Sequence, residues 1–89
     1  MNINTLRALV DAGVKTSAQT LLLETLRVAD RPVSDHELLN FLGAEQLSKL
    51  KRKVSNIVKL GLVEWIQPVF SIHQHLILTP KGKKLMNTK

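Results

Sequence analysis

The sequence predicts a mainly α-helical fold that contains one small β-hairpin. Apolar residues recur at intervals of three and four from Ile3 to Leu60, which is the period of amphipathic helices. After Gly61 the pattern alternates, as it does in half-buried strands. Thr79 and Pro80 then match the start of a short helix, because proline suits the first helical position. With 89 residues and no internal repeat or linker, the chain fits one domain, 1–89.

The first predicted helix covers Ile3–Ala12, within an amino-terminal segment of residues 1–15. Asn2 is placed to cap this helix, and Gly13 is placed to end it. Its expected apolar stripe consists of Ile3, Leu6, Leu9 and Val10. We expect this helix to be a dimer element, and completion of the core is the alternative.

A second helix is predicted to begin near Thr16, because the spacing of Thr16 and Gln19 matches a capping box. It ends at Asp30-Arg31-Pro32, since proline cannot continue the hydrogen-bond ladder and restricts the residue before it. Its expected apolar positions are Ala18, Leu21, Leu22, Leu26 and Ala29.

The strongest local signal is a second capping box, formed by Ser34 and Glu37, which predicts the start of a short helix that ends at Gly43. The expected buried side chains of this helix are Leu38, Leu39, Phe41 and Leu42. Another helix is predicted from about Ala44 to Leu60. Because only a tight turn around Gly43 separates the two, their spacing is that of a helix-turn-helix.

Two strands, Leu62 to Gln67 and Ile72 to Thr79, are predicted from their alternation and their β-branched and aromatic residues. Residues 67–71 join them as a hairpin. A brief basic helix follows, through Met86.

The net charge of +6 is unevenly distributed along the chain. Residues 1–47 carry four basic and six acidic side chains, a net charge of −2, whereas residues 48–89 carry nine basic side chains and one acidic side chain, a net charge of +8. Five of those nine bases lie between Ser48 and Lys59, with no acid among them. A merely solvated helix more often mixes the two signs, so this run favours contact with nucleic acid.

The predicted helix over residues 45–60 has two unlike faces when wound at about 100° per residue. Leu50, Val54 and Ile57 form the apolar face, flanked by Leu47 and Val58. The opposite face holds Glu45, Ser48, Lys49, Arg52, Ser55, Asn56 and Lys59, with Lys51 and Lys53 on the shoulders. Lysine and arginine neutralise phosphates, and Arg, Asn and Ser reach base edges, so the helix suits a DNA groove.

The order of elements, together with Gly61-Leu62-Val63 and Leu78-Thr79-Pro80-Lys81-Gly82, resembles winged helix-turn-helix DNA-binding regulators, closest to the MarR type. In that family a Gly-Leu-Val follows the recognition helix and a Leu-Thr-x-x-Gly closes the second wing strand. The resemblance covers about residues 17–85. It implies that residues 45–60 enter the major groove of double-stranded DNA.

The resemblance also implies roles for individual residues. Five side chains are expected to contact bases, namely Gln46, Ser48, Lys49, Arg52 and Asn56. Lys51 and Lys53 are expected to contact phosphates. Lys81, Lys83 and Lys84 either support phosphate contact or are solvated cations at a helix end.

The sequence departs from the family in two places. MarR-type proteins are longer and dimerise through extra terminal helices that also form a ligand pocket, so an effector ligand is not expected here. No Lys or Arg lies between Leu60 and Pro80, although wings that grip the minor groove usually carry one. The hairpin is therefore expected either to contact DNA weakly or to bind a protein through Val69 and Phe70.

The sequence gives little support for other classes of functional site. The absence of Cys excludes disulfides and thiolate metal sites. His73 and His75 have no nearby carboxylate, so no metal site is expected, and no cofactor or activated nucleophile is indicated. With only Phe41, Trp65 and Phe70 as aromatic residues, single-strand or RNA readout is not expected. No apolar run approaches the ~18–20 residues of a membrane span and no signal peptide is visible, so a cytoplasmic protein is expected.

The sequence-based hypothesis is a non-enzymatic transcriptional regulator, a repressor rather than an activator, that binds double-stranded DNA as a homodimer. Two other functions stay open. One is a winged-helix protein-interaction module, which the uncharged hairpin favours. The other is an accessory factor for DNA replication or recombination.

Overall fold

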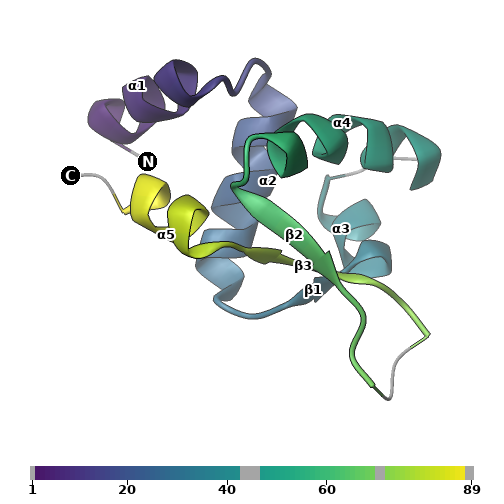
Figure 1. Cartoon of the computed structure of the whole chain (residues 1–89). Coiled ribbons are helices and arrows are strands. Elements are labelled where there is room, and N and C mark those ends of the chain that lie inside the picture. The colour runs from purple at the N-terminus through teal and green to yellow at the C-terminus, as the bar shows by residue number, and fades with distance from the viewer. Residues whose placement is uncertain (1, 43–46, 70–71, 88–89) are drawn as a thin grey trace.

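The computed structural model describes residues 2–42, 47–69 and 72–87, with side chains described except at 41, 42, 47–51 and 53. The helices are α1 (Ile3–Ala12), α2 (Ser17–Ala29), α3 (Asp35–Leu42), α4 (Leu47–Lys59) and α5 (Pro80–Met86), and the strands are β1 (Val33–Ser34), β2 (Val63–Ile66) and β3 (His75–Leu78) (Figure 1). The mainly helical class is therefore confirmed.

Local capping explains where the helices begin. The side chain of Asn2 accepts from the amide of Thr5 at 2.8 Å, and the hydroxyl of Thr16 accepts from the amide of Gln19 at 3.2 Å. The hydroxyl of Ser34 accepts from the amide of Glu37 at 3.1 Å. Each bond satisfies an amide that the first turn of a helix leaves without a partner. The predicted starts of α1, α2 and α3 are confirmed.

The sheet has three antiparallel strands in the order β1-β3-β2. The sequence predicts only the β2–β3 hairpin, and both strands are shorter than predicted. In the second pairing, between β1 and β3, Val33 lies opposite Leu76 and Ser34 opposite His75. With two residues, β1 is too short to carry an alternating pattern of its own, and only its partner β3 makes it a strand.

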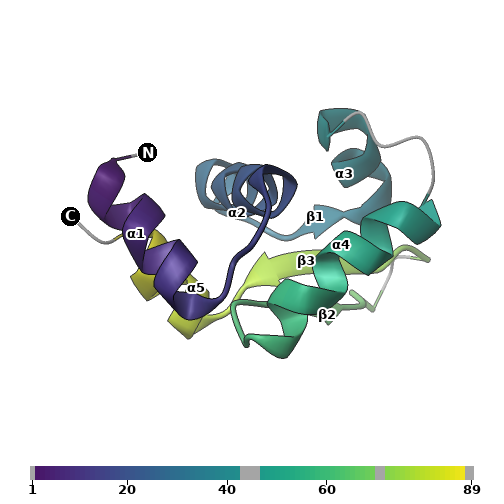
Figure 2. The ribbon, with the colours of Figure 1, turned by 90° about the horizontal axis from the view of Figure 1, so that it is seen from above.

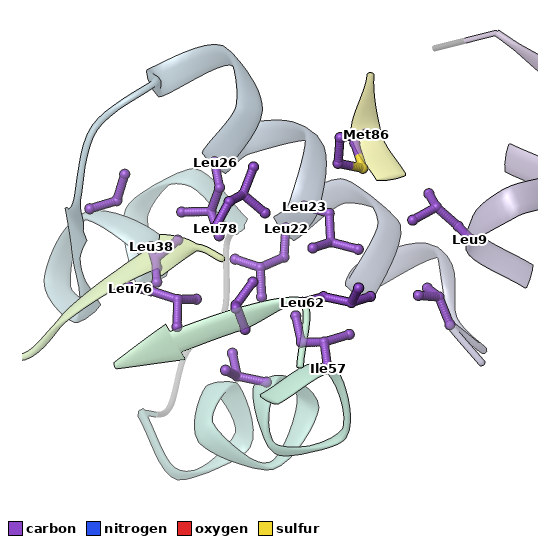
Figure 3. Packing of buried hydrophobic residues seen from close by; sticks show 14 residues of the cluster. Leu9, Leu22, Leu23, Leu26, Leu38, Ile57, Leu62, Leu76, Leu78 and Met86 are labelled. Carbon is purple, nitrogen blue, oxygen red and sulfur yellow. The ribbon is translucent and has the colours of Figure 1, made fainter. Parts of the chain in front are cut away.

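The hydrophobic core lies between α2, α4 and the sheet. Leu22, Leu23 and Leu26 of α2 pack among side chains from α3, α4 and the strands, and Leu9 and Met86 extend the cluster toward α1 and α5 (Figure 3). Leu38 is buried as predicted, and Leu39 is half-buried against this cluster. The predicted burial of Phe41 and Leu42 lies outside the described side chains.

The predicted apolar stripe of α1 is mostly exposed. Leu9 is fully buried, but Ile3 and Val10 are 72% and 63% exposed, and Leu6 is also exposed. The buried residues of α1 are Thr5 and Leu9, because the helix packs on α5 along a narrow strip and leaves its apolar side uncovered. Leu21, one of the expected apolar positions of α2, is also exposed, whereas Leu23, which that set omits, is fully buried.

Different helices lie at the two ends of the molecule. Helices α1 and α5 lie at one end, and the amino end of α4 lies with α3 at the opposite end (Figures 1 and 2). The charged helix is thereby presented away from the exposed apolar side of α1.

Candidate nucleic-acid interface

Helix α4 has one face in the core and one in solvent. Val54 and Ile57 are fully buried, and Val58 is half-buried against the same cluster. Arg52, Ser55 and Lys59 are exposed. The two-faced helix that the apolar spacing predicts is therefore present in its described part, with exposed cations opposite the core.

The residues predicted to contact DNA are only partly described. Arg52 projects from the exposed face of α4. Ser48, Lys49, Lys51 and Lys53 lie on the backbone of the same helix, but their side chains are outside the described set. Gln46 lies outside the described residues, as does the turn around Gly43. The helix is described from Leu47, so the predicted start near Ala44 also lies outside.

The side chain of Asn56 is less exposed to solvent than the sequence indicates. The residue is half-buried, and its Nδ2 atom is enclosed, with no hydrogen-bond partner among the described residues. An enclosed amide donor without a partner is unfavourable, typically by about 1–3 kcal/mol. Asn56 therefore lies at the margin of the exposed face of α4 rather than at its centre.

Helix α3 is tied to the hairpin at its amino end. The amide of Asp35 donates to the carbonyl oxygen of Gln74 at 3.1 Å, next to the β1–β3 pairing. Asp35 Oδ1 lies 3.6 Å from His73 Nδ1, and the rings of His36 and His73 stack with centroids 6.4 Å apart. The expectation that no carboxylate lies near His73 is therefore wrong, because the β1–β3 pairing brings Asp35 beside it. The fold thus fixes α3, the helix that precedes the charged helix, against the base of the hairpin.

The hairpin carries exposed apolar side chains where a DNA-gripping wing would carry cations. Val69 is 90% exposed and Ile72 is 88% exposed, on either side of the two residues that are not described, Phe70 and Ser71. Glu64 is the one formally charged residue between Leu60 and Pro80 in the sequence. Any contribution of this hairpin to phosphate binding must therefore come from neutral groups.

The carboxyl end of α4 meets a lysine for which the sequence indicates other roles. Lys81 Nζ donates to the carbonyl oxygen of Leu60 at 2.9 Å, across 21 residues of sequence. The two roles predicted for Lys81 are a phosphate contact and a solvated cation at its own helix end. No local signal points to Leu60, because the contact depends on how β2 and β3 return the chain.

The described residues hold no group of three or more histidines and carboxylates arranged for a metal ion. In the same part of the chain, every helix is too short or too polar to cross a membrane.

No protein-family model matches the chain, and no curated protein matches it. Solved structures do match. The complex of S. aureus MepR with DNA has a TM-score of 0.78 at 16% identity, over 93% of this chain and 67% of that one. NadR in complex with 4-hydroxyphenylacetate has a TM-score of 0.74 at 23% identity, over 91% and 56% of the two chains. The heme sensor PefR from Streptococcus agalactiae, in complex with heme, has a TM-score of 0.73 at 20% identity, over 90% and 56%.

These neighbours are winged-helix regulators of the MarR family. The present chain therefore has a winged helix-turn-helix fold, and the resemblance stated from its motifs is confirmed at the level of the fold. The chain spans between 56% and 67% of the length of these three proteins. A shared fold by itself does not transfer a function, which has to be argued from the site.

Proposed function

We propose that this chain is a small, non-enzymatic transcriptional regulator that binds double-stranded DNA through α4. One observation carries the proposal. The described part of α4 turns Val54 and Ile57 into the core and Arg52, Ser55 and Lys59 into solvent, so a basic face is presented outward. The likeness to MepR, a protein of the same fold solved in complex with DNA, supports the proposal.

The chemistry of that face suits a major groove. A duplex carries closely spaced phosphates, and each lysine or arginine that neutralises one releases a counterion. A guanidinium also donates two parallel hydrogen bonds to guanine, and a carboxamide does the same to adenine. We assign base contacts to Gln46, Ser48, Lys49, Arg52 and Asn56, and phosphate contacts to Lys51 and Lys53.

We further propose that the chain acts as a homodimer and a repressor. One chain presents one recognition helix, and two-fold operators pair two such helices about one helical turn apart. The exposed apolar side of α1, with Leu6 and Val10, lies beside Leu21 of α2 along a groove of about 460 Å³. Burying that surface against a second copy stabilises a dimer. A bound dimer represses by covering the DNA that it occupies, in the cytoplasm where the genome is accessible.

A titration of a fluorescent random-sequence duplex at two salt concentrations tests DNA binding. We expect micromolar affinity that falls steeply with salt, since several phosphates are neutralised. No binding at low salt contradicts the proposal. Selection of bound sites from a random duplex pool then identifies the operator, and a transcription reporter separates a repressor from a replication or recombination factor.

A protein-interaction module is the second candidate, and the exposed apolar hairpin favours it. Val69 and Ile72, which flank Phe70 and Ser71 in the sequence, are uncharged and exposed. Hydrophobic side chains exposed in this way suit a protein surface better than a phosphate backbone. If this function is the right one, the duplex titration shows no salt-dependent binding, and Val69→Asp abolishes binding to the protein partner.

A further inference from the structure

Three successive carbonyl groups at the exit of α4 are bonded by one short segment at the start of α5. Lys81 Nζ donates to the oxygen of Leu60 at 2.9 Å, and Thr79 Oγ1 donates to the oxygen of Gly61 at 2.6 Å. The amide of Thr79 donates to the oxygen of Leu62 at 3.0 Å. We call these three hydrogen bonds the exit clamp.

The exit clamp begins where the hydrogen bonds of α4 end. An α-helix leaves its last four carbonyls without intrahelical partners, and in α4 these are the carbonyls of residues 56–59. At the end of α4 the chain turns at Gly61, whose φ is +77°, and the amides of Gly61 and Leu62 donate back to Val58 and Ile57 at 2.9 and 3.1 Å. The carbonyls of residues 60–62 belong to the turn that follows the helix, and Thr79 and Lys81 donate to them. The ammonium group of Lys81 also favours the negative end of the α4 dipole.

The Thr79 hydroxyl serves both helices at once. It donates to Gly61 and accepts from the amide of Gly82 at 3.0 Å, which starts α5. The close approach of α5 to residue 62 reinforces this arrangement, because Gly82 leaves no room for a side chain between them. The start of α5 and the end of α4 are therefore joined through one side chain, 18 residues apart in sequence.

We infer that Thr79 and Lys81 are positioning residues for the recognition helix. The exit clamp holds the carboxyl end of α4 against α5, so that α4 is presented to DNA in one orientation. This inference rests on the proposed DNA binding. It also explains why the Gly61-Leu62-Val63 and Leu78-Thr79-Pro80-Lys81-Gly82 motifs occur together. Thr79 of the second motif donates hydrogen bonds to Gly61 and Leu62 of the first, and Gly82 packs against the backbone of Leu62.

Lys81→Gln tests the inference, with Lys84→Gln as the matched control. Both changes remove one positive charge from an exposed position of α5. We expect Lys81→Gln to weaken operator binding about threefold to tenfold relative to Lys84→Gln, with equal salt slopes in the two variants. The amides of Leu60, Gly61 and Leu62 exchange hydrogen faster in the Lys81 variant only.

The same two variants also test the alternative that Lys81 contacts DNA. If it contacts a phosphate instead, Lys81→Gln lowers the salt slope by about one relative to Lys84→Gln and leaves the exchange rates of residues 60–62 unchanged. That outcome overturns the positioning role.

Two variants of Thr79 separate the clamp from the folding of α5. Thr79→Ser keeps both the donor and the acceptor, and we expect exchange rates and DNA affinity like those of the unmodified chain. Thr79→Asp keeps an acceptor for the Gly82 amide but cannot donate to Gly61. We expect faster exchange at residues 60–62 and weaker operator binding, with the Lys83 amide of α5 still protected.

Equal exchange at residues 60–62 in the Ser and Asp variants overturns the clamp. Failure of the unmodified chain to bind any duplex overturns the proposed function instead. The exchange rates decide the clamp in either case, because they are measured without DNA.

Discussion

Gly82 lies directly against the backbone of Leu62. A Cβ atom on residue 82 would lie 2.0 Å from the carbonyl oxygen of Leu62 and 3.2 Å from a methyl carbon of Leu78. The oxygen is part of the backbone, so it cannot move aside as a flexible side chain can. We expect Gly82→Ala to lower the free energy of unfolding by about 1–3 kcal/mol or more, the range of overpacked cores. Urea denaturation measures the loss.

Gly61→Ala is the comparison for this variant. Among the described residues, a Cβ on Gly61 meets only the Lys81 side chain, at 3.9 Å, so its cost comes from the left-handed φ of +77°. That cost is about 1–2 kcal/mol. A Gly82→Ala loss smaller than the Gly61→Ala loss would show that α5 can move away from Leu62.

Arg52 and Lys51 are expected to affect DNA binding in different ways. Arg52 is exposed on α4, and its assigned role is base contact. Arg52→Ala should weaken operator binding by about 1–3 kcal/mol and leave binding to random duplex nearly unchanged. Lys51→Ala should weaken both and lower the salt slope by about one. Anisotropy titrations on the two duplexes check this, and unchanged affinity in both variants removes α4 from the interface.

Replacement of Asn56 by alanine should stabilise the fold and weaken DNA binding. Its Nδ2 is enclosed without a partner among the described residues, and alanine is a better helix former than asparagine. We expect Asn56→Ala to raise the free energy of unfolding by about 0.5–1 kcal/mol while weakening operator binding. A residue kept at a cost to stability is typical of a functional site. Thermal unfolding that shows a destabilised variant would instead mean that the amide is well bonded.

Leu9 and Leu6, three positions apart on α1, should behave differently. Leu9 is fully buried, so Leu9→Ala should destabilise the fold by about 2–5 kcal/mol. Leu6 is exposed beside Val10, so Leu6→Asp should leave the monomer folded and shift the association equilibrium toward monomer. Sedimentation velocity measures the association state, and denaturation at two protein concentrations measures the stability. Together they distinguish the loss of folding in Leu9→Ala from the loss of association in Leu6→Asp. An unchanged sedimentation profile for Leu6→Asp argues that the dimer uses another surface.

The ion pair of Glu24 and Arg27 should give a small pH dependence. The hydrogen bond from Arg27 lowers the pKa of the Glu24 carboxyl below its usual value. A carboxylate with a lowered pKa stabilises the fold above its unfolded pKa, and the contribution is lost as pH falls through the folded pKa. Glu24→Gln should therefore lower the melting temperature slightly at pH 7 and by less at pH 3. The effect is small because solvent screens the pair, and an equal loss at both pH values would point to a packing cause.

Much of the fold is encoded locally, and those parts are predicted correctly. The limits of α1 and the caps at Asn2, Thr16, Ser34 and Thr79 depend on residues within four positions of one another. Gly13 ends α1 with a φ of +105°, as predicted. The two faces of α4 follow from the same short-range periodicity. Hence the class of fold and the charged helix can be derived from the sequence.

The errors all involve partners distant in sequence. Periodicity shows that α1 and α2 each have an apolar side, but it does not show how much of that side a neighbour covers. The exposed Val10 and Leu21 and the buried Leu23 depend on where α5 and the sheet pack. Strand β1 exists because β3 lies opposite Val33 and Ser34.

By itself, the sequence determined where the helices and the β2–β3 hairpin form, which helix carries the basic excess and which fold the two motifs indicate. The tertiary structure decided which apolar residues stay exposed, how far Asn56 is enclosed and what Lys81 binds. The physical reason is the range of the interactions. Caps, turns and helical faces are set within a few residues, whereas burial and the exit clamp form only when segments such as Leu60 and Lys81 are brought together by the folded chain.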